Sequence, residues 1–248
     1  MRRPSSAYTS SFSFGPGPIS TTLKALIGAN VAAFVVTSLM PGLKGYLGLV
    51  PALVIHQFWV WQLVTYMFLH GGVFHILFNM LALWMFGGEL ERVWGSRYFL
   101  KFYFVTGIGA AVLTVLIAML PFGFAQQIML SNTMGASGAI YGLLLAFAMY
   151  FPDRPILLIV FPVPAKIAVT ILGAIALFSS LGESGGVANA THLSGLAVAY
   201  FYLKGARLRL HPIAEVKYRY LKWKINRVRK KFDVYSGGRA NDFDRRVH

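Results

Sequence analysis

The sequence predicts an all-α membrane protein, built as a compact bundle of six transmembrane helices. Of its 248 residues, 56% are hydrophobic and only 12% are charged, and the mean hydropathy is +0.61. Soluble domains typically carry about twice that charged fraction. Apolar runs that suit a hydrocarbon core also recur along the chain. We expect the spans to cover residues 23–40, 73–88, 98–120, 135–150, 165–181 and 189–206.

The distribution of Lys and Arg favours six spans over seven. The apolar run 49–69 is long enough to be counted as a further span. With six spans, 22 of the 23 Lys and Arg fall on one side of the membrane and only Lys44 on the other. A span at 49–69 would move nineteen of those 22 across, against the positive-inside rule. We therefore expect 41–72 to be an apolar external loop embedded in the membrane interface or packed on the bundle, with both termini cytoplasmic.

The two ends of the chain differ from the bundle at residues 21–206. Residues 1–20 are rich in Ser, Gly and Pro, which predicts a flexible cytoplasmic tail and no secretory signal peptide. Residues 207–248 form a basic cytoplasmic tail with interleaved aromatics. This tail fits two interpretations equally: an amphipathic helix on anionic lipids, or a solvated tail that enforces the topology. Nucleic-acid binding is a distant third interpretation, so we expect no nucleic-acid partner.

Two of the expected spans, 73–88 and 135–150, are short. Sixteen residues make about 24 Å of helix, against a hydrocarbon core of ~30 Å. A short helix leaves its end below the membrane surface, and Ser137 lies at such an end. The preceding stretch 121–134 contains several polar residues, and we expect it to be an external loop that admits water.

Five polar residues within these spans need an explanation, because polar groups are costly in hydrocarbon. His75 and Asn79 lie four residues apart on one face of the second span, as Ser137 and Tyr141 do on the fourth. His192 lies on the sixth span. The expected topology puts His75, Ser137 and His192 near the external ends of their helices. At this shared depth the three side chains can converge on one site.

Small residues recur at helical spacing on two spans: Gly138, Gly142 and Ala146 on the fourth, Gly195 and Ala199 on the sixth. Such stripes let helix backbones approach closely. Close approach of these two spans would bring Ser137 within hydrogen-bonding reach of His192. Ordinary helix packing explains each stripe taken alone.

The acidic residues narrow the chemistry. All eight Asp and Glu are expected in loops or tails, so an intramembrane aspartyl mechanism has no residues to use. The pattern His-Glu-x-x-His and cysteine are both absent, so we expect no metal, no cofactor and no cysteine nucleophile. No carboxylate is placed to orient His192, which favours a Ser137–His192 dyad over a triad. The ring of Tyr141 is the candidate for positioning His192.

The oxyanion of such a reaction needs preorganised donors. The candidates are the backbone N–H of Ser137 at a helix N-terminus and the side chains of His75 and Asn79. Gly135 would let the loop turn into this helix. His70 lies about 140° around a helix from His75, so we expect it to fix the loop and not to take part in the reaction.

Several motifs follow one another in order: Trp61-Gln62-Leu63-Val64-Thr65-Tyr66 leading to His70, His70-x4-His75-x3-Asn79, Gly87-Gly88-Glu89-Leu90-Glu91, Gly135-Ala136-Ser137-Gly138 with Tyr141-Gly142, and Thr191-His192-Leu193-Ser194-Gly195. Across 23–206 the chain resembles the rhomboid intramembrane serine proteases of the six-helix bacterial type. The combination is far more specific than any one of these motifs.

The resemblance implies Ser137 as nucleophile and His192 as general base, with Tyr141 packed on His192. It implies an oxyanion site of His75, Asn79 and the Ser137 amide, and a membrane-embedded loop between helices 1 and 2. It implies transmembrane segments of other proteins, single-span ones included, as substrates, cut near the outer membrane face and often after a small residue. The implied location is a bacterial inner membrane, with the site opening toward the periplasmic side.

Two positions depart from the family pattern: Gln62 replaces the arginine of a Trp-Arg pair, and Ala199 replaces a second glycine. Neither changes the dyad. One alternative function is a catalytically silent rhomboid-like protein that binds transmembrane clients, which the intact Ser137 and His192 disfavour. Another is a small transporter or channel, which the expected absence of carboxylates and Lys/Arg pairs near the midplane disfavours.

Overall fold

The structure is a computed structural model that describes residues 17–158, 161–180, 189–205 and 222. The described chain up to Tyr202 belongs to one compact unit, and residues 203–248 form a second unit. The basic tail expected at 207–248 therefore lies outside the described residues, except for Lys222.

The described residues are mostly helical, in agreement with the predicted class. The elements are α1 (Thr21–Leu39), α2 (Leu43–Leu47), α3 (Pro51–Gln57), α4 (Gln62–Thr65), η1 (Tyr66–Phe68), α5 (Val73–Ala82), η2 (Leu83–Gly87), α6 (Gly88–Trp94), α7 (Ser96–Ala118), α8 (Gly123–Leu130), α9 (Ser137–Tyr150), β1 (Pro155–Leu158), β2 (Phe161–Pro164) and α10 (Ala165–Ser180). A further helix covers residues 189–205. The antiparallel pair β1–β2 is a short hairpin between α9 and α10.

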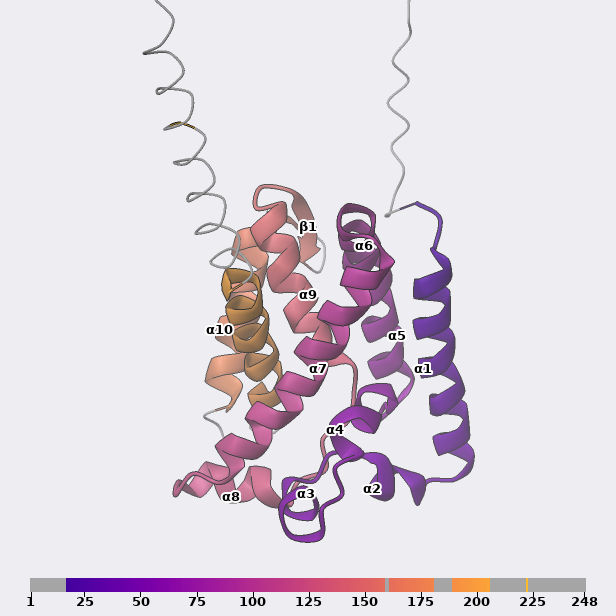
Figure 1. Ribbon diagram of the computed structural model, residues 1–248, viewed down its shortest axis with the longest axis vertical. Coiled ribbons are helices and arrows are strands. Elements are labelled where there is room, and N and C mark those ends of the chain that lie inside the picture. The colour runs from indigo at the N-terminus through magenta and orange to yellow at the C-terminus, as the bar shows by residue number, and fades with distance from the viewer. Residues whose placement is uncertain (1–16, 159–160, 181–188, 206–221, 223–248) are drawn as a thin grey trace, which may run out of the picture. The chain divides into compact units, whose positions relative to one another are not determined.

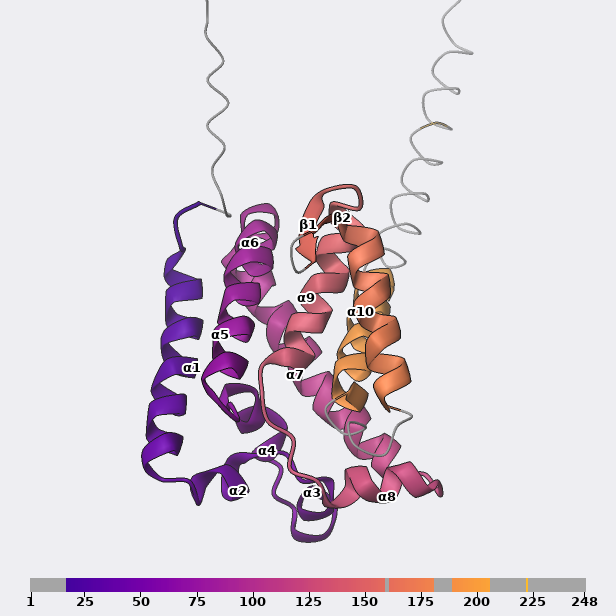
Figure 2. The same cartoon turned by 180° about the vertical axis from the view of Figure 1, so that it is seen from behind.

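Among the described residues, three helices are long and apolar enough to cross a membrane: Thr21–Leu39, Val73–Trp94 and Ser96–Ala118. The apolar helix α9 is shorter. Its 14 residues make about 21 Å of helix, less than the ~30 Å of a hydrocarbon core. Figures 1 and 2 show α2, α3 and α8 at one end of the unit and α6 with the β1–β2 hairpin at the other.

The second span was wrongly expected to end at Gly88. The helix continues through the π-helical turn η2 and through α6 to Trp94, 22 residues in all, or about 33 Å. Gly87 and Gly88 both keep helical backbone angles, so the pair does not end the helix. Close packing explains the first glycine, since a Cβ on Gly87 would lie 3.2 Å from the ring of Phe99.

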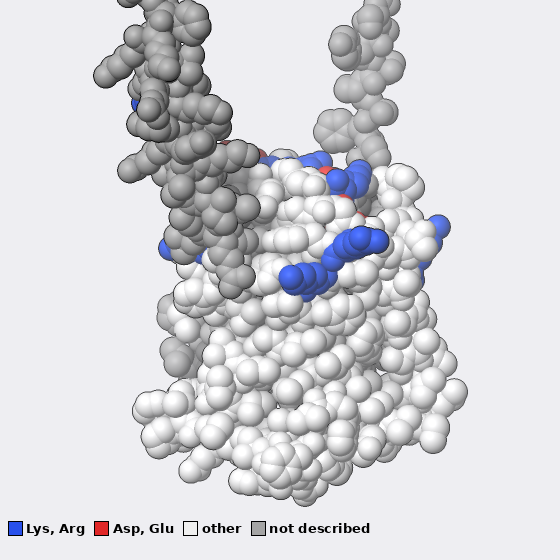
Figure 3. Space-filling view, viewed as in Figure 1, with Lys and Arg blue, Asp and Glu red and all other residues white. Residues whose placement is uncertain are grey.

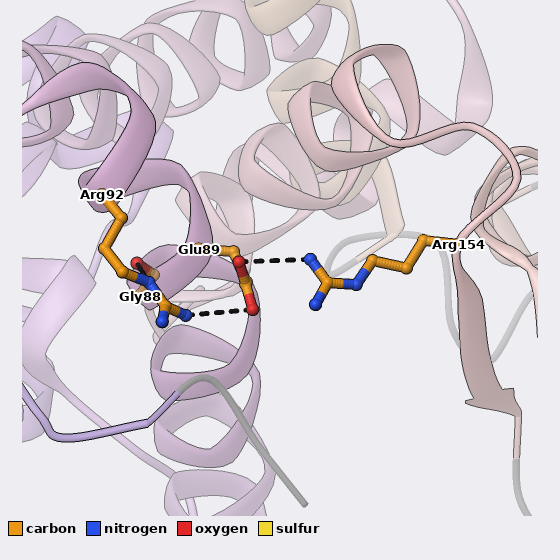
Figure 4. Close-up of polar contacts among 4 residues, drawn as sticks. All are labelled: Gly88, Glu89, Arg92 and Arg154. Carbon is orange, nitrogen blue, oxygen red and sulfur yellow. Dashed lines mark hydrogen bonds and ion pairs between the residues drawn. The ribbon is translucent and has the colours of Figure 1, made fainter. Parts of the chain in front are cut away.

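The longer helix also corrects the expected position of two acids, because Glu89 and Glu91 lie on α6 and not in a loop. Glu91 is buried, and its carboxylate accepts hydrogen bonds from the hydroxyls of Ser20 and Ser96 at 2.5 and 2.6 Å. These bonds join the starts of α1 and α7 to α6. Glu89 lies between Arg92 and Arg154 at 2.9 and 3.2 Å (Figure 4).

The stretch 41–72 is more structured than a plain loop, because α2, α3, α4 and η1 all lie within it. Gln62 is fully buried there and joins its parts: Oε1 accepts from the N–H of Val50 at 3.0 Å, and Nε2 donates to the carbonyl of Tyr46 at 3.2 Å. Gln62, which replaces the arginine of the family pattern, thus holds the parts of this segment together. Thr65 adds a bond to the Leu47 carbonyl.

The stretch 121–134 was expected to be a loop, but it contains α8. Ala125 and Ile128 are three residues apart and both are buried, so one face of α8 packs against the protein. The expected loop therefore contains a packed helix, which its polar residues did not predict.

Candidate active site

The turn into α9 requires Gly135. Its φ of +130° lies in a region that side chains rarely adopt. Its N–H donates to the Tyr66 carbonyl at 2.9 Å, which ties the turn to η1. A Cβ at this position would also lie 2.9 Å from both Cε1 and Nε2 of His75. Backbone conformation and close packing therefore both demand glycine two residues before Ser137.

Ser137 and His192 meet across two helices. Ser137 begins α9, His192 lies on the helix 189–205, and Oγ of the serine is 2.8 Å from Nε2 of the histidine. Nδ1 of His192 is buried and has no hydrogen-bond partner among the residues that the structure describes. Glu183, the nearest acid upstream in the sequence, lies outside those residues.

Tyr141 lies one turn after Ser137 on α9. Its ring stacks on that of His192, with centroids 4.3 Å apart and planes inclined by 8°. This contact covers one face of the imidazole and limits its rotation, which fits the positioning role expected for Tyr141.

Gly138 on α9 and Gly195 on the helix 189–205 let these two helices approach closely. A Cβ on Gly195 would collide with the carbonyl group of Gly138. A Cβ on Gly138 would in turn lie 3.0 Å from Cβ of Ala110 on α7. Gly142, expected on the same stripe, faces α7 as well, since its Cβ would lie 3.0 Å from Cβ of Thr106. The stripe on α9 therefore serves two neighbouring helices and not the last helix alone.

His75 comes next to the Ser137 turn from the start of α5. Its Cε1–Nε2 edge faces Gly135, as described above, and its Nδ1 accepts from the N–H of Gly71 at 3.3 Å. Asn79 is buried one turn further along, and its Nδ2 donates to the His75 carbonyl at 2.9 Å. This hydrogen bond stays within α5, and among the described residues the Asn79 amide makes no hydrogen bond to the turn at Gly135.

His70 is fully buried beside His75, and the two rings meet edge to face with centroids 5.1 Å apart. Burial is the main cause that lowers the pKa of His70, and the neighbouring His75 adds to it. A hydrogen bond to the backbone of Phe68 partly offsets both, and the resulting pKa is about 4. The buried ring of His70 is therefore neutral near pH 7. Its place against His75 gives it a packing role in addition to the expected role in the loop.

The residues just before Ser137 are hydrogen-bonded to the segment 41–72, a connection that the sequence did not predict. Leu49 and Thr133 exchange two backbone hydrogen bonds, of 2.9 and 2.8 Å. Nδ2 of Asn132 donates to the Lys44 carbonyl at 2.9 Å. These bonds hold Asn132 and Thr133, which precede Ser137, against the segment 41–72. The partners lie more than 80 residues apart, and no local pattern predicts such a pairing.

A family model and several curated relatives match this chain. The model of the rhomboid domain matches residues 57–207, which is more than half of the chain and contains every candidate site residue. The chain is 31% identical over 184 residues to rhomboid protein 1, mitochondrial, of Saccharomyces cerevisiae, which covers 72% of this chain and 51% of that protein. It is 30% identical over 147 residues to RHOMBOID-like protein 2 of Arabidopsis thaliana, which covers 59% and 42%.

The match to the rhomboid protease GluP of Bacillus subtilis is 38% identical over 84 residues, or 34% of this chain and 14% of that protein. The chain spans about half the length, or less, of these curated relatives. The matched domain and the apolar helices together identify an integral membrane protein. The chain belongs to the rhomboid family, which includes serine-type intramembrane proteases.

Proposed function

We propose that this protein is an intramembrane serine endopeptidase that hydrolyses peptide bonds in or next to transmembrane segments of other membrane proteins. The observation that carries the proposal is the 2.8 Å separation between Oγ of Ser137 and Nε2 of His192. A serine hydroxyl within hydrogen-bonding distance of a histidine ring nitrogen is the arrangement that nucleophilic catalysis needs.

The reaction follows from this pair. As Oγ of Ser137 attacks the scissile carbonyl carbon, its proton passes to Nε2 of His192. The imidazolium then protonates the leaving amine, and the C–N bond breaks to leave an acyl ester on Ser137. Water attacks the ester, gives its proton to Nε2, and the released Oγ takes that proton back. Stacking on Tyr141 keeps the His192 ring aligned through both steps.

Three groups are proposed to stabilise the oxyanion. The N–H of Ser137 lies at the N-terminus of α9, where the helix dipole favours negative charge. The Nε2 edge of His75 faces the adjacent Gly135. Asn79 is the third donor, since its Nδ2 carries two hydrogens and the bond to the His75 carbonyl occupies one.

The topology is part of the proposal: six spans, both termini cytoplasmic, and a membrane-embedded segment 41–72 on the opposite side with the site. The distribution of charge supports it. On the face in Figure 3, the Lys and Arg gather at the end of the unit that holds α6 and the β1–β2 hairpin. Lys44, on α2, lies at the other end. A bacterial inner membrane stays a prediction, since the relatives come from a yeast, a plant and a bacterium.

The proposed partners are transmembrane substrates and the surrounding bilayer. Cleavage of a labelled single-span protein in liposomes tests the proposal, with Ser137→Ala compared with Ser38→Ala, which removes an exposed hydroxyl from α1. We expect product from the wild type and from Ser38→Ala and none from Ser137→Ala. Equal product from all three would reject Ser137 as nucleophile. Stable capture of the labelled protein without any product would support the catalytically silent alternative.

A further inference from the structure

We propose that the backbone N–H of Gly71 sets the tautomer of His75, so that the Nε2–H of the imidazole points at the place where the oxyanion forms. This inference rests on the proposed function and makes Gly71 a positioning residue for it. The assignment follows from two contacts on opposite edges of one ring.

The first contact is at Nδ1 of His75, which accepts the Gly71 N–H at 3.3 Å. A neutral imidazole carries one N–H donor and one bare acceptor nitrogen, whereas a protonated imidazole has no acceptor. A ring that accepts at Nδ1 is therefore neutral and carries its hydrogen on Nε2. The backbone amide thus selects one of the two tautomers.

The second contact is at the opposite edge of the ring. A Cβ built on Gly135 would lie 2.9 Å from Nε2 of His75 and 3.6 Å from Oγ of Ser137. The Nε2–H therefore borders the space between the glycine turn and the nucleophile. Among the described residues, no group accepts a hydrogen bond from this nitrogen. The donor is thus available to an oxygen that enters the site.

The buried ring of His70 helps to hold this orientation, because it packs edge to face against His75 at 5.1 Å. The same arrangement also has a purely structural explanation. Gly72 is the N-cap of α5, and a side chain three residues later that reaches back to a free N–H resembles a capping box. Capping needs an acceptor at position 75, whereas the proposed role needs an acceptor and a donor in one side chain.

The substitutions Gly71→Pro and Gly71→Ala form a matched pair. Proline removes the N–H. Alanine keeps it, and its Cβ would lie 3.8 Å from Nδ1, an ordinary contact. One hydrogen bond shifts a two-state population by about fivefold. Without the N–H, the Nε2–H tautomer should fall from most of the population to about half, so kcat should fall about twofold while KM stays unchanged.

The experiment reads the imidazole nitrogens of the full-length, ¹⁵N-histidine-labelled protein by NMR, with the His75 signals assigned from His75→Gln. We expect bare Nδ1 and protonated Nε2 in the wild type and in Gly71→Ala, and a mixture of tautomers in Gly71→Pro. Protonated Nδ1 in the wild type would overturn the inference even if Gly71→Pro does not fold. So would identical spectra from the two Gly71 variants.

Activity provides a separate reading. Glutamine at position 75 can both accept from Gly71 and donate to an oxyanion, whereas methionine at that position can do neither well. We expect His75→Gln to keep more of the turnover than His75→Met, and equal turnover would contradict the donor role. If the wild type cleaves no substrate, the proposed function fails, while the tautomer assignment still stands or falls on the spectrum.

Discussion

Gly195 lies against the backbone carbonyl of Gly138, where the helix 189–205 meets α9. A Cβ on Gly195 would lie 2.9 Å from the carbonyl carbon and closer still to its oxygen. Ser137 precedes Gly138 by one residue, and His192 precedes Gly195 by three. The distance between the two backbones therefore decides whether serine and histidine can bond.

The first prediction is that Gly195→Ala damages both stability and activity. A carbonyl oxygen cannot rotate away as a flexible side chain can, so the helices must move apart. Overpacking of this kind costs about 1–3 kcal/mol of unfolding free energy. The midpoint temperature of unfolding and the cleavage rate should both be lower in Gly195→Ala than in Gly28→Ala. Gly28→Ala is the control, since nothing lies within 4 Å of a Cβ at Gly28. Equal behaviour of the two variants would rule out the close approach.

The second prediction concerns Gln62. Gln62→Ala removes two hydrogen bonds inside the segment 41–72 and leaves the N–H of Val50 without its partner. An unsatisfied buried group costs about 1–3 kcal/mol, so the unfolding free energy should fall by that amount. Gln57→Ala is the control, because Gln57 is an exposed glutamine of the same segment. Equal unfolding midpoints would show that Gln62 anchors nothing.

The third prediction separates the ring of Tyr141 from its hydroxyl. Tyr141→Phe keeps the stacked ring on His192, whereas Tyr141→Ala removes it. Aromatic pairs are worth about 0.5–1.5 kcal/mol beyond burial, so kcat of the alanine variant should fall about two- to tenfold below that of the phenylalanine variant. Measured kcat values that agree for Phe and Ala would remove Tyr141 from the positioning role.

The fourth prediction is a loss of stability in mild acid that depends on His70. The folded pKa of about 4 lies below the ordinary histidine value of 6.5, so the unfolded chain binds more protons between these values. The contribution of neutral His70 to the unfolding free energy is fully present above pH 6.5. It is lost as the pH falls toward 4, by up to about 3 kcal/mol.

Unfolding midpoints measured across that pH range test the effect. His70→Asn should flatten the loss relative to the wild type, and His56→Asn, at an exposed histidine, should leave it unchanged. The ring of His75 packs against that of His70. The result is therefore read from the difference between the variants and not from the wild-type curve alone. Parallel curves for the wild type and His70→Asn would contradict the prediction.

The sequence was sufficient to predict the fold class, the family and the candidate site residues. It was not sufficient to predict most of the contacts between them. The positions of Lys and Arg predicted a common depth for Ser137, His75 and His192 before any contact was known. The rhomboid resemblance is confirmed by the matched domain. The roles of the site residues stay predictions, and the expected span count is part of the proposal.

What the sequence could not supply depends on tertiary packing. The second helix was expected to end at Gly88, but it continues to Trp94, and the ring of Phe99 fills the space beside Gly87. Gln62 differs from the family pattern, and the sequence did not indicate its hydrogen-bond partners. Tyr46 and Val50 come within reach of Gln62 only after the segment 41–72 folds. The pairing of Leu49 with Thr133 joins distant parts of the chain and leaves no periodic signal.

The most direct test of the central claim is covalent labelling of Ser137. The purified protein is treated with a fluorophosphonate, and the adduct is located by mass spectrometry of its peptides. The Ser137–His192 pair predicts an adduct on Ser137 in the wild type and none at that position in His192→Ala. Labelling of Ser137 at the same rate without His192, or an adduct on another serine with Ser137 unmodified, would contradict the account.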